Sequence, residues 1–221
     1  MVIRTLSAIV MATFALVIIF LGSPYFETFI LFVGLLGIIE WYRLVLFNSL
    51  KISNIIIMLV GFFYILFPCL ILIWLRNHGE YGLYFVIWFF VVIWATDIGA
   101  YLVGRTIGGA KLAPKISPNK TWSGFIGGLF ISLISSLLLD LFFSLTINFL
   151  ILTLGCILLS IVGQIGDLFE SWCKRRLGVK DTGTLIPGHG GILDRVDSIL
   201  LSAPVAGFVA FIFQNHEISW K

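Results

Sequence analysis

Charged residues are scarce in this chain. Asp, Glu, Lys and Arg make up only 11% of its 221 residues, whereas 60% of the residues are hydrophobic. A soluble globular domain carries about 25% charged residues, so the composition excludes that class. The formal net charge of +3 is small. We therefore expect no nucleic-acid partner. For the prediction of function, the positions of the charged residues are more informative than the net charge.

Cysteine is scarce as well. The chain has three cysteines, Cys69, Cys156 and Cys173, with no CxxC pair and no histidine close to any of them. This pattern argues against a zinc site or a disulfide framework. A free cysteine behaves as a small hydrophobic residue, so we expect all three to be packing residues.

Charge is missing, or nearly so, from long stretches of the chain. A membrane-spanning helix needs about 20 predominantly apolar residues. The apolar stretches cover residues 5–26, 28–47, 52–75, 81–103, 122–143, 149–165 and 198–213. The sequence therefore predicts an all-α, polytopic integral membrane bundle of about seven transmembrane helices, with a turn at residues 144–148. The first stretch lacks a small-residue cleavage site, so we expect it to be an uncleaved helix rather than a signal peptide.

The basic residues predict how the bundle is oriented. If the N-terminus is cytoplasmic, seven spans place every Lys and Arg except Arg76 and Lys221 on the cytoplasmic side. This is the distribution that the positive-inside rule requires. We divide the chain into three N-terminal spans, residues 1–80, and a catalytic transmembrane region, residues 81–221. The latter carries two polar cytoplasmic loops, residues 104–122 and 171–197.

The first polar loop is basic and rich in turn residues. Its lysines, Lys111, Lys115 and Lys120, are separated by Gly, Pro and Ser rather than by helix formers. This spacing predicts a structured loop rather than an amphipathic helix. A basic loop that only contacts anionic lipid headgroups is the alternative interpretation.

The second polar region begins inside the sixth span. Its polar residues share one face of a helix, and they are Gln164, Asp167, Glu170, Ser171 and Lys174. Acids within a span usually face a functional interior, although Asp167 lies near the end of its span and could instead reach the membrane surface. Within the second span, Glu40 and Arg43 lie three residues apart, and we expect them to pair.

A glycine-rich turn then leads into the last helix, where Asp194 and Asp197 precede the apolar span at residues 198–213. Acids at a helix N-terminus also complement the helix dipole, which would explain one of them. Three carboxylates that converge without a cation would repel one another. We therefore expect Asp167, Asp194 and Asp197 to hold Mg²⁺, which prefers oxygen ligands. Whether a second cation binds there is left open. Asp97 is interpreted equally well as a site residue or a packing residue.

The segment "SWCKRRLGVKDTGTLIPGHGGILDRVD", residues 171–197, closely resembles the signature of the phosphatidate cytidylyltransferases, or CDP-diacylglycerol synthases. The signature positions are Ser171, Lys174, Arg175, Lys180, Asp181, His189, Gly190, Gly191, Asp194, Arg195 and Asp197. "TDIGAYLVGR" and "APKISPNKTWSG" also resemble family segments, so the resemblance covers about residues 95–215. Ser123 departs from the Glu or Gln that is more frequent in the family, and the chain is shorter than typical members.

The resemblance implies an enzyme that transfers a cytidylyl group from CTP to phosphatidate, giving CDP-diacylglycerol and diphosphate for phospholipid synthesis. It also implies that Asp167, Asp194 and Asp197 are the metal ligands. The candidate catalytic residues are these three with Lys115, Lys174 and Arg175. The candidate substrate-binding residues are Lys111, Ser117, Lys120, Ser171, Lys180, Asp181, His189, Gly190, Gly191 and Arg195.

Other functions stay open at this point. A CTP-dependent lipid-alcohol kinase of the polyprenol type would use similar chemistry. A transporter would place its charges near the middle of the bilayer in repeated halves. We expect CTP, phosphatidate and membrane lipids as partners, with a homodimer left open. The expected location is the bacterial plasma (inner) membrane, with the active site facing the cytoplasm.

Overall fold

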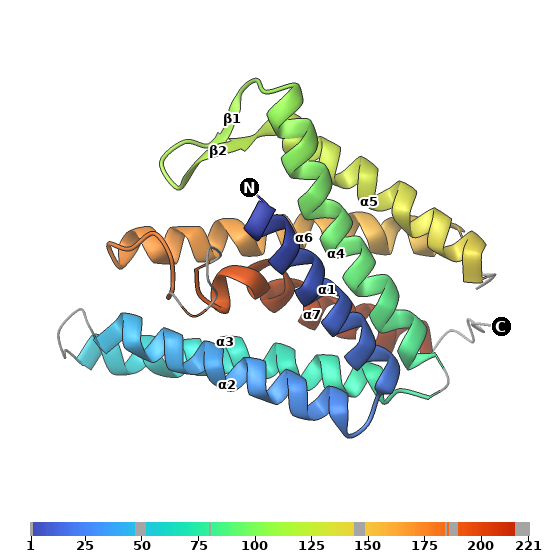
Figure 1. The fold of residues 1–221 in the computed structure, drawn as a ribbon, viewed down its shortest axis with the longest axis horizontal. Helices are drawn as coiled ribbons and strands as arrows, with labels where there is room; N and C mark the ends of the chain where they lie inside the picture. The colour runs from blue at the N-terminus through green and yellow to red at the C-terminus, as the bar shows by residue number, and fades with distance from the viewer. Residues whose placement is uncertain are drawn as a thin grey trace.

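The computed structural model describes residues 2–46, 52–79, 81–143, 149–183, 185 and 190–214. Within these residues the fold is a bundle of helices with one short hairpin (Figure 1). The elements are α1 (Val2–Leu21), α2 (Tyr25–Leu46), α3 (Ile52–Arg76), α4 (Gly82–Thr106), β1 (Lys111–Ala113), β2 (Ser117–Thr121), α5 (Trp122–Phe143), α6 (Phe149–Arg176) and α7 (Leu193–Gln214). The all-α prediction is confirmed. The turn predicted at residues 144–148 lies outside the described residues.

Among the described residues, five helices are long and apolar enough to cross a membrane by length and composition. They are Tyr25–Leu46, Ile55–Arg76, Gly82–Thr106, Trp122–Phe143 and Leu152–Arg176. A shorter apolar helix, Val10–Leu21, belongs to α1. The remaining helix, α7, begins with three charged residues, Asp194, Arg195 and Asp197. Each predicted span thus corresponds to a helix, and the protein is an integral membrane protein.

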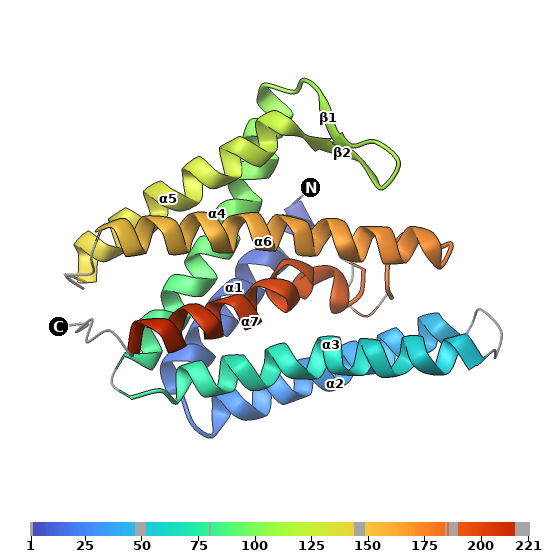
Figure 2. The same cartoon turned by 180° about the vertical axis from the view of Figure 1, so that it is seen from behind.

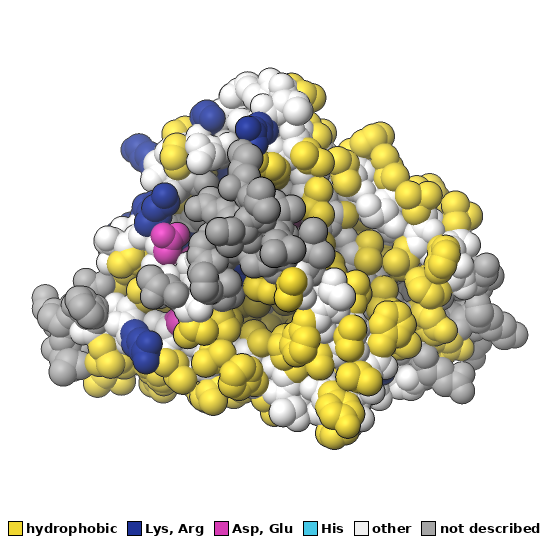
Figure 3. Space-filling model, in the orientation of Figure 1, with side chains coloured by type: hydrophobic (Ala, Val, Ile, Leu, Met, Phe, Trp, Pro, Cys, Tyr) yellow, Lys and Arg dark blue, Asp and Glu magenta, His cyan; other side chains and the backbone are white. Residues whose placement is uncertain are grey.

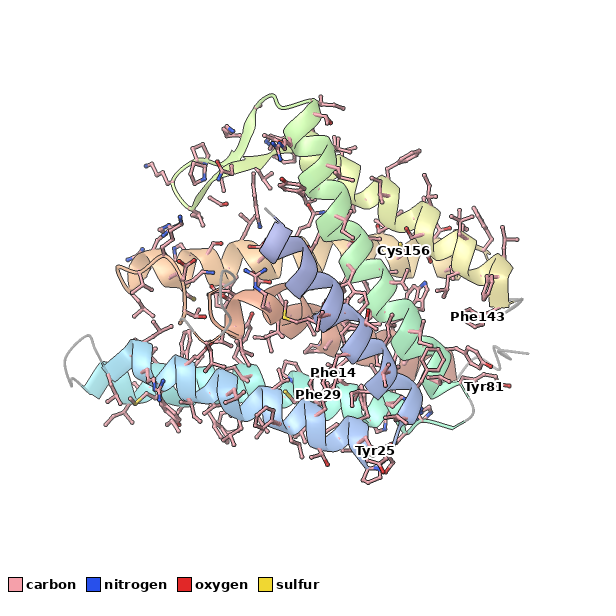
Figure 4. The ribbon with its side chains drawn as sticks, viewed as in Figure 1. Phe14, Tyr25, Phe29, Tyr81, Phe143 and Cys156 are labelled. Atoms are coloured by element: carbon pink, nitrogen blue, oxygen red, sulfur yellow. The ribbon has the colours of Figure 1, made fainter. Side chains whose placement is uncertain are left out.

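The helices form antiparallel pairs, and the ends of these pairs lie toward two opposite sides of the bundle. Figures 1 and 2 show α2 beside α3, α6 beside α7, and α4 beside α5. The hairpin, the end of α6 and the start of α7 lie toward the same side of the bundle (Figure 1). Tyr25, Tyr81 and Phe143 lie toward the opposite side (Figure 4). Tyrosine is typical of membrane–water interfaces, so these two ends correspond to the two membrane surfaces.

Charge is distributed in the same way on the visible face of the molecule. Figure 3 shows the Lys and Arg side chains gathered toward the side that carries the hairpin, whereas hydrophobic side chains cover much of the rest. The apolar surface suits contact with lipid chains. The clustered basic groups agree with the predicted grouping of the polar loops at one membrane surface.

Close packing of α4 on α5 fixes the base of the hairpin that joins them. A Cβ atom at Gly124 would lie 2.7 Å from the carbonyl oxygen of Ala100, and one at Gly128 would lie 2.9 Å from the carbonyl oxygen of Thr96. Small residues allow membrane helices to approach this closely. Because the two helices are pressed together, both ends of the hairpin start from defined positions.

Buried hydroxyl groups link α4 to its other neighbours. Thr96 Oγ1 donates a hydrogen bond of 2.8 Å to Ser160 Oγ of α6, and Trp88 Nε1 donates one of 2.6 Å to Ser136 Oγ of α5. Such bonds connect helices inside a bilayer. The three cysteines are free, and Cys69 and Cys156 are buried, which confirms their prediction as packing residues.

Candidate active site at one end of the bundle

The first polar loop is an antiparallel β-hairpin. β1 pairs with β2, with Lys111 opposite Thr121 and Ala113 opposite Ser117. Lys111 and Lys115 are exposed. The prediction of a structured loop is confirmed, and the structure is more regular than expected. The hairpin places its basic side chains beyond the ends of α4 and α5.

The hairpin is tied to α6 at two points. Lys120 Nζ lies 2.6 Å from Asp167 Oδ2, in an ion pair whose side chains are 26% and 31% exposed. Arg175 Nε donates a hydrogen bond of 3.4 Å to the carbonyl oxygen of Ile116. Ser171 Oγ donates to Asp167 Oδ1 over 3.4 Å. These contacts bring three candidate site residues, Lys120, Asp167 and Ser171, together.

The polar residues of α6 share one face, as their spacing predicts. Gln164 Nε2 donates to the carbonyl oxygen of Phe125 in α5 over 3.3 Å. Nearly three turns further on, Lys174 Nζ lies 3.1 Å from Glu170 Oε1 and 2.6 Å from Asp194 Oδ1 of α7. The Lys174 and Asp194 side chains are only 11% and 6% exposed. This face therefore connects α5, the hairpin and α7.

Asp194 organises the turn that precedes α7. Its Oδ2 atom accepts hydrogen bonds from the amides of Gly191 (2.8 Å) and Thr182 (2.9 Å) and from Thr182 Oγ1 (3.0 Å). Burial alone would raise the pKa of Asp194, but the bond from Lys174 and the two amide donors outweigh burial and lower this pKa. Gly190 has a φ of 83°, and a Cβ there would lie 2.6 Å from Asp194 Oδ2. Glycine is needed at that position.

Asp197 lies among negative charges. Burial, and then the charges of Asp167, Glu170 and Asp97, raise the pKa of Asp197 well above its usual value. Its Oδ1 atom accepts the Ser198 amide at 2.8 Å, while Ser198 Oγ donates to Asp97 Oδ2 over 3.2 Å. Asp97 of α4 therefore lies beside this acidic cluster and contacts α7 through Ser198. Like charges that approach one another favour a bound cation.

The oxygen donors fit Mg²⁺, but the three predicted ligands are not gathered around one point. Among the described residues, no three His, Cys, Asp or Glu side chains stand close enough to hold one ion. Asp194 is turned toward Lys174 and the preceding turn, because those donors satisfy both of its oxygens. Lysine ammonium groups lie 2.6 Å from Asp167 and from Asp194. These ion pairs show that positive charge is favoured at both carboxylates. The carboxylates around Asp197 likewise favour additional positive charge near that residue.

The other candidate residues lie around this cluster. Lys180, Asp181 and Arg195 are exposed and Gly191 is buried. Within the described part of the chain, no hydrogen bond or ion pair holds the side chains of Lys111, Lys115, Lys180 or Asp181. His189 lies outside the described residues.

An apolar cavity of about 630 Å³ opens beside the cluster, between α1, α2, α3, α4 and α7. Phe14 and Phe29, whose ring centroids are 5.4 Å apart, form part of its wall (Figure 4). Among the described residues that line it, only Asp97 and Arg195 carry charge. The cavity thus joins an apolar space to the charged end of the bundle.

Sequence reasoning missed the role of Glu40. Instead of the expected pairing with Arg43, the Glu40 carboxylate accepts hydrogen bonds from the amides of Ile192 (2.9 Å) and Leu193 (3.0 Å) and from Thr182 Oγ1 (3.2 Å). A single acid within an apolar span was the signal that could have indicated this role. The sequence does not show which partner such an acid meets.

Fold and site together define a polytopic helical membrane protein in which acidic and basic groups from separate helices meet at one membrane surface. The chain belongs to the cytidylyltransferase family, whose profile matches residues 45–213. It is 46% identical over 158 residues to the phosphatidate cytidylyltransferase of Brucella suis biovar 1 (strain 1330), covering 72% of this chain and 58% of the relative.

Two further relatives carry the same name. The protein of Bacillus subtilis (strain 168) is 48% identical over 139 residues, which is 63% of this chain and 52% of the relative. The protein of Rickettsia bellii (strain RML369-C) is 38% identical over 215 residues, which is 93% of this chain and 89% of the relative. The chain thus spans between half and three fifths of the length of the first two relatives and most of the length of the third.

Proposed function

We propose that the protein transfers a cytidylyl group from CTP to phosphatidate and releases diphosphate, which makes CDP-diacylglycerol for phospholipid synthesis. One observation carries this proposal. In a chain of the cytidylyltransferase family, carboxylates and lysines from the hairpin, α6 and α7 meet at one membrane surface beside an apolar cavity. That combination suits a reaction between a water-soluble nucleotide and a membrane lipid.

The chemistry needs positioning more than proton transfer. A phosphate oxygen of phosphatidate bonds to the α-phosphorus of CTP, and the bond from that phosphorus to the bridging oxygen breaks as diphosphate leaves. The lipid phosphate is already ionised at neutral pH, so the main obstacle is repulsion between two polyanions. Basic side chains that hold phosphates offset this repulsion and align the attack. The proposed substrate-binding and phosphate-binding residues are Lys111, Lys115, Ser117, Lys120, Ser171, Lys174, Arg175, Lys180, Asp181, His189, Gly190, Gly191 and Arg195.

We propose that Asp167, Asp194 and Asp197 hold Mg²⁺, with a second cation open. Asp167 Oδ2 and Asp194 Oδ1 would be released by Lys120 and Lys174, and these two lysines would then be free for phosphate oxygens. When bound, Mg²⁺ supplies positive charge for the triphosphate and for the leaving diphosphate.

The surroundings suit a lipid substrate. The apolar cavity would receive the acyl chains of phosphatidate, and Arg195 at its edge would face the lipid phosphate. The basic end of the bundle would lie at the cytoplasmic face of the bacterial plasma membrane, where CTP is found. A homodimer is compatible with this arrangement.

Labelled CTP tests the proposal. Purified protein is incubated with phosphatidate, Mg²⁺ and CTP that carries label in its cytosine. We expect the label to enter the lipid phase and diphosphate to be released. In a parallel incubation that supplies a lipid alcohol in place of phosphatidate, label that stays in the aqueous phase as CDP, with phosphate added to the alcohol, would instead support the kinase alternative.

A further inference from the structure

Glu40 is a buried acid, 3% exposed, on an N-terminal helix. Each carboxylate oxygen accepts at least one hydrogen bond from the segment around residues 182–193. Oε1 accepts the Ile192 amide, while Oε2 accepts the Leu193 amide and Thr182 Oγ1. Amides at the start of a helix have no partner within the helix. Glu40 thus caps α7 from a helix more than 140 positions away in the sequence.

Two glycines of this segment, Gly183 and Gly191, pack against the same carboxylate. A Cβ at Gly183 would lie 2.9 Å from Glu40 Oε1, and one at Gly191 would lie 2.5 Å from Glu40 Oε2. Both positions therefore need a residue without a side chain if Glu40 is to approach. Contact with Glu40 and Thr182 alone explains why residue 191 is a glycine, so a bound ligand is not needed to explain it.

Thr182 connects Glu40 to the candidate site. Its hydroxyl oxygen lies 3.2 Å from Glu40 Oε2 and 3.0 Å from Asp194 Oδ2. Asp181 precedes this threonine, and Asp194 follows Leu193 directly. A shift of Glu40 would therefore move both ends of the segment that carries these acids.

We propose that Glu40 is a positioning residue for cytidylyl transfer, acting through Thr182 and the first amides of α7. This inference rests on the proposed function. Glu40 lies outside the matched family region, residues 45–213. The N-terminal helices would therefore contribute to the geometry of the site in addition to anchoring it in the membrane.

Substitutions at two acids of α2 test the inference in the full-length protein. Glu40→Ala removes all three contacts, and Glu40→Gln keeps one acceptor oxygen. Glu27→Ala is the matched control, because Glu27 lies at the other end of α2 and its Oε1 accepts a 2.7 Å hydrogen bond from Asn77 Nδ2. We expect Glu40→Ala to lower kcat about 100-fold, as misplacement by about 1 Å can do, with a smaller change in KM for CTP. Glu40→Gln should recover part of the loss, and Glu27→Ala should keep the wild-type kcat.

Hydrogen exchange supplies a second readout that does not depend on turnover. We expect the Ile192 and Leu193 amides to exchange faster in Glu40→Ala, or in Glu40→Gln if the alanine variant does not fold, while α4 and α6 exchange as in the wild type. Unchanged kcat together with unchanged exchange at these amides would overturn the inference. If the wild-type protein transfers no cytidylyl group, the proposed function fails, and local exchange alone then decides whether Glu40 positions the segment.

Discussion

The two polar segments at the charged end of the bundle are held in different ways. The hairpin, residues 111–121, is attached to α6 by one ion pair and one long hydrogen bond to a backbone carbonyl. In the described part of the segment at residues 180–197, the carboxylates of Glu40 and Asp194 accept hydrogen bonds from four backbone amides, those of Thr182, Gly191, Ile192 and Leu193. Both carboxylates also lie within hydrogen-bonding distance of the Thr182 hydroxyl.

The difference suggests a division of roles. The exposed side chains of Lys111 and Lys115 on the hairpin can adjust to the phosphates of an incoming nucleotide. The Asp194 carboxylate, by contrast, is held in a fixed position by Lys174 and by the amides of Thr182 and Gly191. Fixed first-contact groups supported by a surrounding hydrogen-bond network are a general requirement of active sites.

The largest effect is expected in the fixed segment. Asp197→Asn removes charge from the carboxylate cluster and should lower cytidylyl transfer by about 1000-fold, since the loss of electrostatic stabilisation at a reacting phosphate is of that order. Asp194→Asn should have a comparable effect. The check is turnover per folded molecule, with helical content measured by circular dichroism. Near-normal activity in both variants would remove the metal assignment.

An intermediate effect is expected in the hairpin. Lys120→Ala removes a group that would pass from Asp167 to a phosphate, and we expect kcat/KM to fall about 10- to 100-fold. Arg176→Ala is the control, because Arg176 is exposed and lies over the Trp172 ring at 5.2 Å. Equal activities in the two variants would show that Lys120 has no part in phosphate binding.

The smallest effects concern stability. Thr182→Val breaks hydrogen bonds to two carboxylates and should cost about 1–3 kcal/mol of unfolding free energy. Thr121→Val breaks the bond from the Gly124 amide to Thr121 Oγ1, 3.1 Å, at the start of α5 and should cost about 1 kcal/mol. Thermal unfolding in detergent compares the two variants. A larger loss for Thr121→Val would reverse the ranking of the two segments.

The sequence predicted the parts of this arrangement that depend on local periodicity. Apolar runs locate the helices, and the spacing of Gln164, Asp167 and Lys174 places them on one face of α6. The hairpin was not predicted as strands, because β1 and β2 have only three and five residues and show no clear alternation. The partner of Glu40 could not be predicted, because Ile192 is 152 positions away in the sequence. Likewise, the orientation of Asp194 depends on a turn whose geometry the sequence does not encode locally.

Binding of Mn²⁺ in place of Mg²⁺ tests the central claim, that carboxylates of α6 and α7 gather at one membrane surface to hold a divalent cation with CTP. Electron paramagnetic resonance reports the free Mn²⁺ that remains after titration with purified protein at a fixed CTP concentration, against a reference that contains the same CTP without protein, because CTP itself binds Mn²⁺. We expect the wild-type protein to lower free Mn²⁺ below this reference and the Asp167→Asn/Asp197→Asn double variant to leave it at the reference level. Equal Mn²⁺ binding by the two proteins would contradict the account.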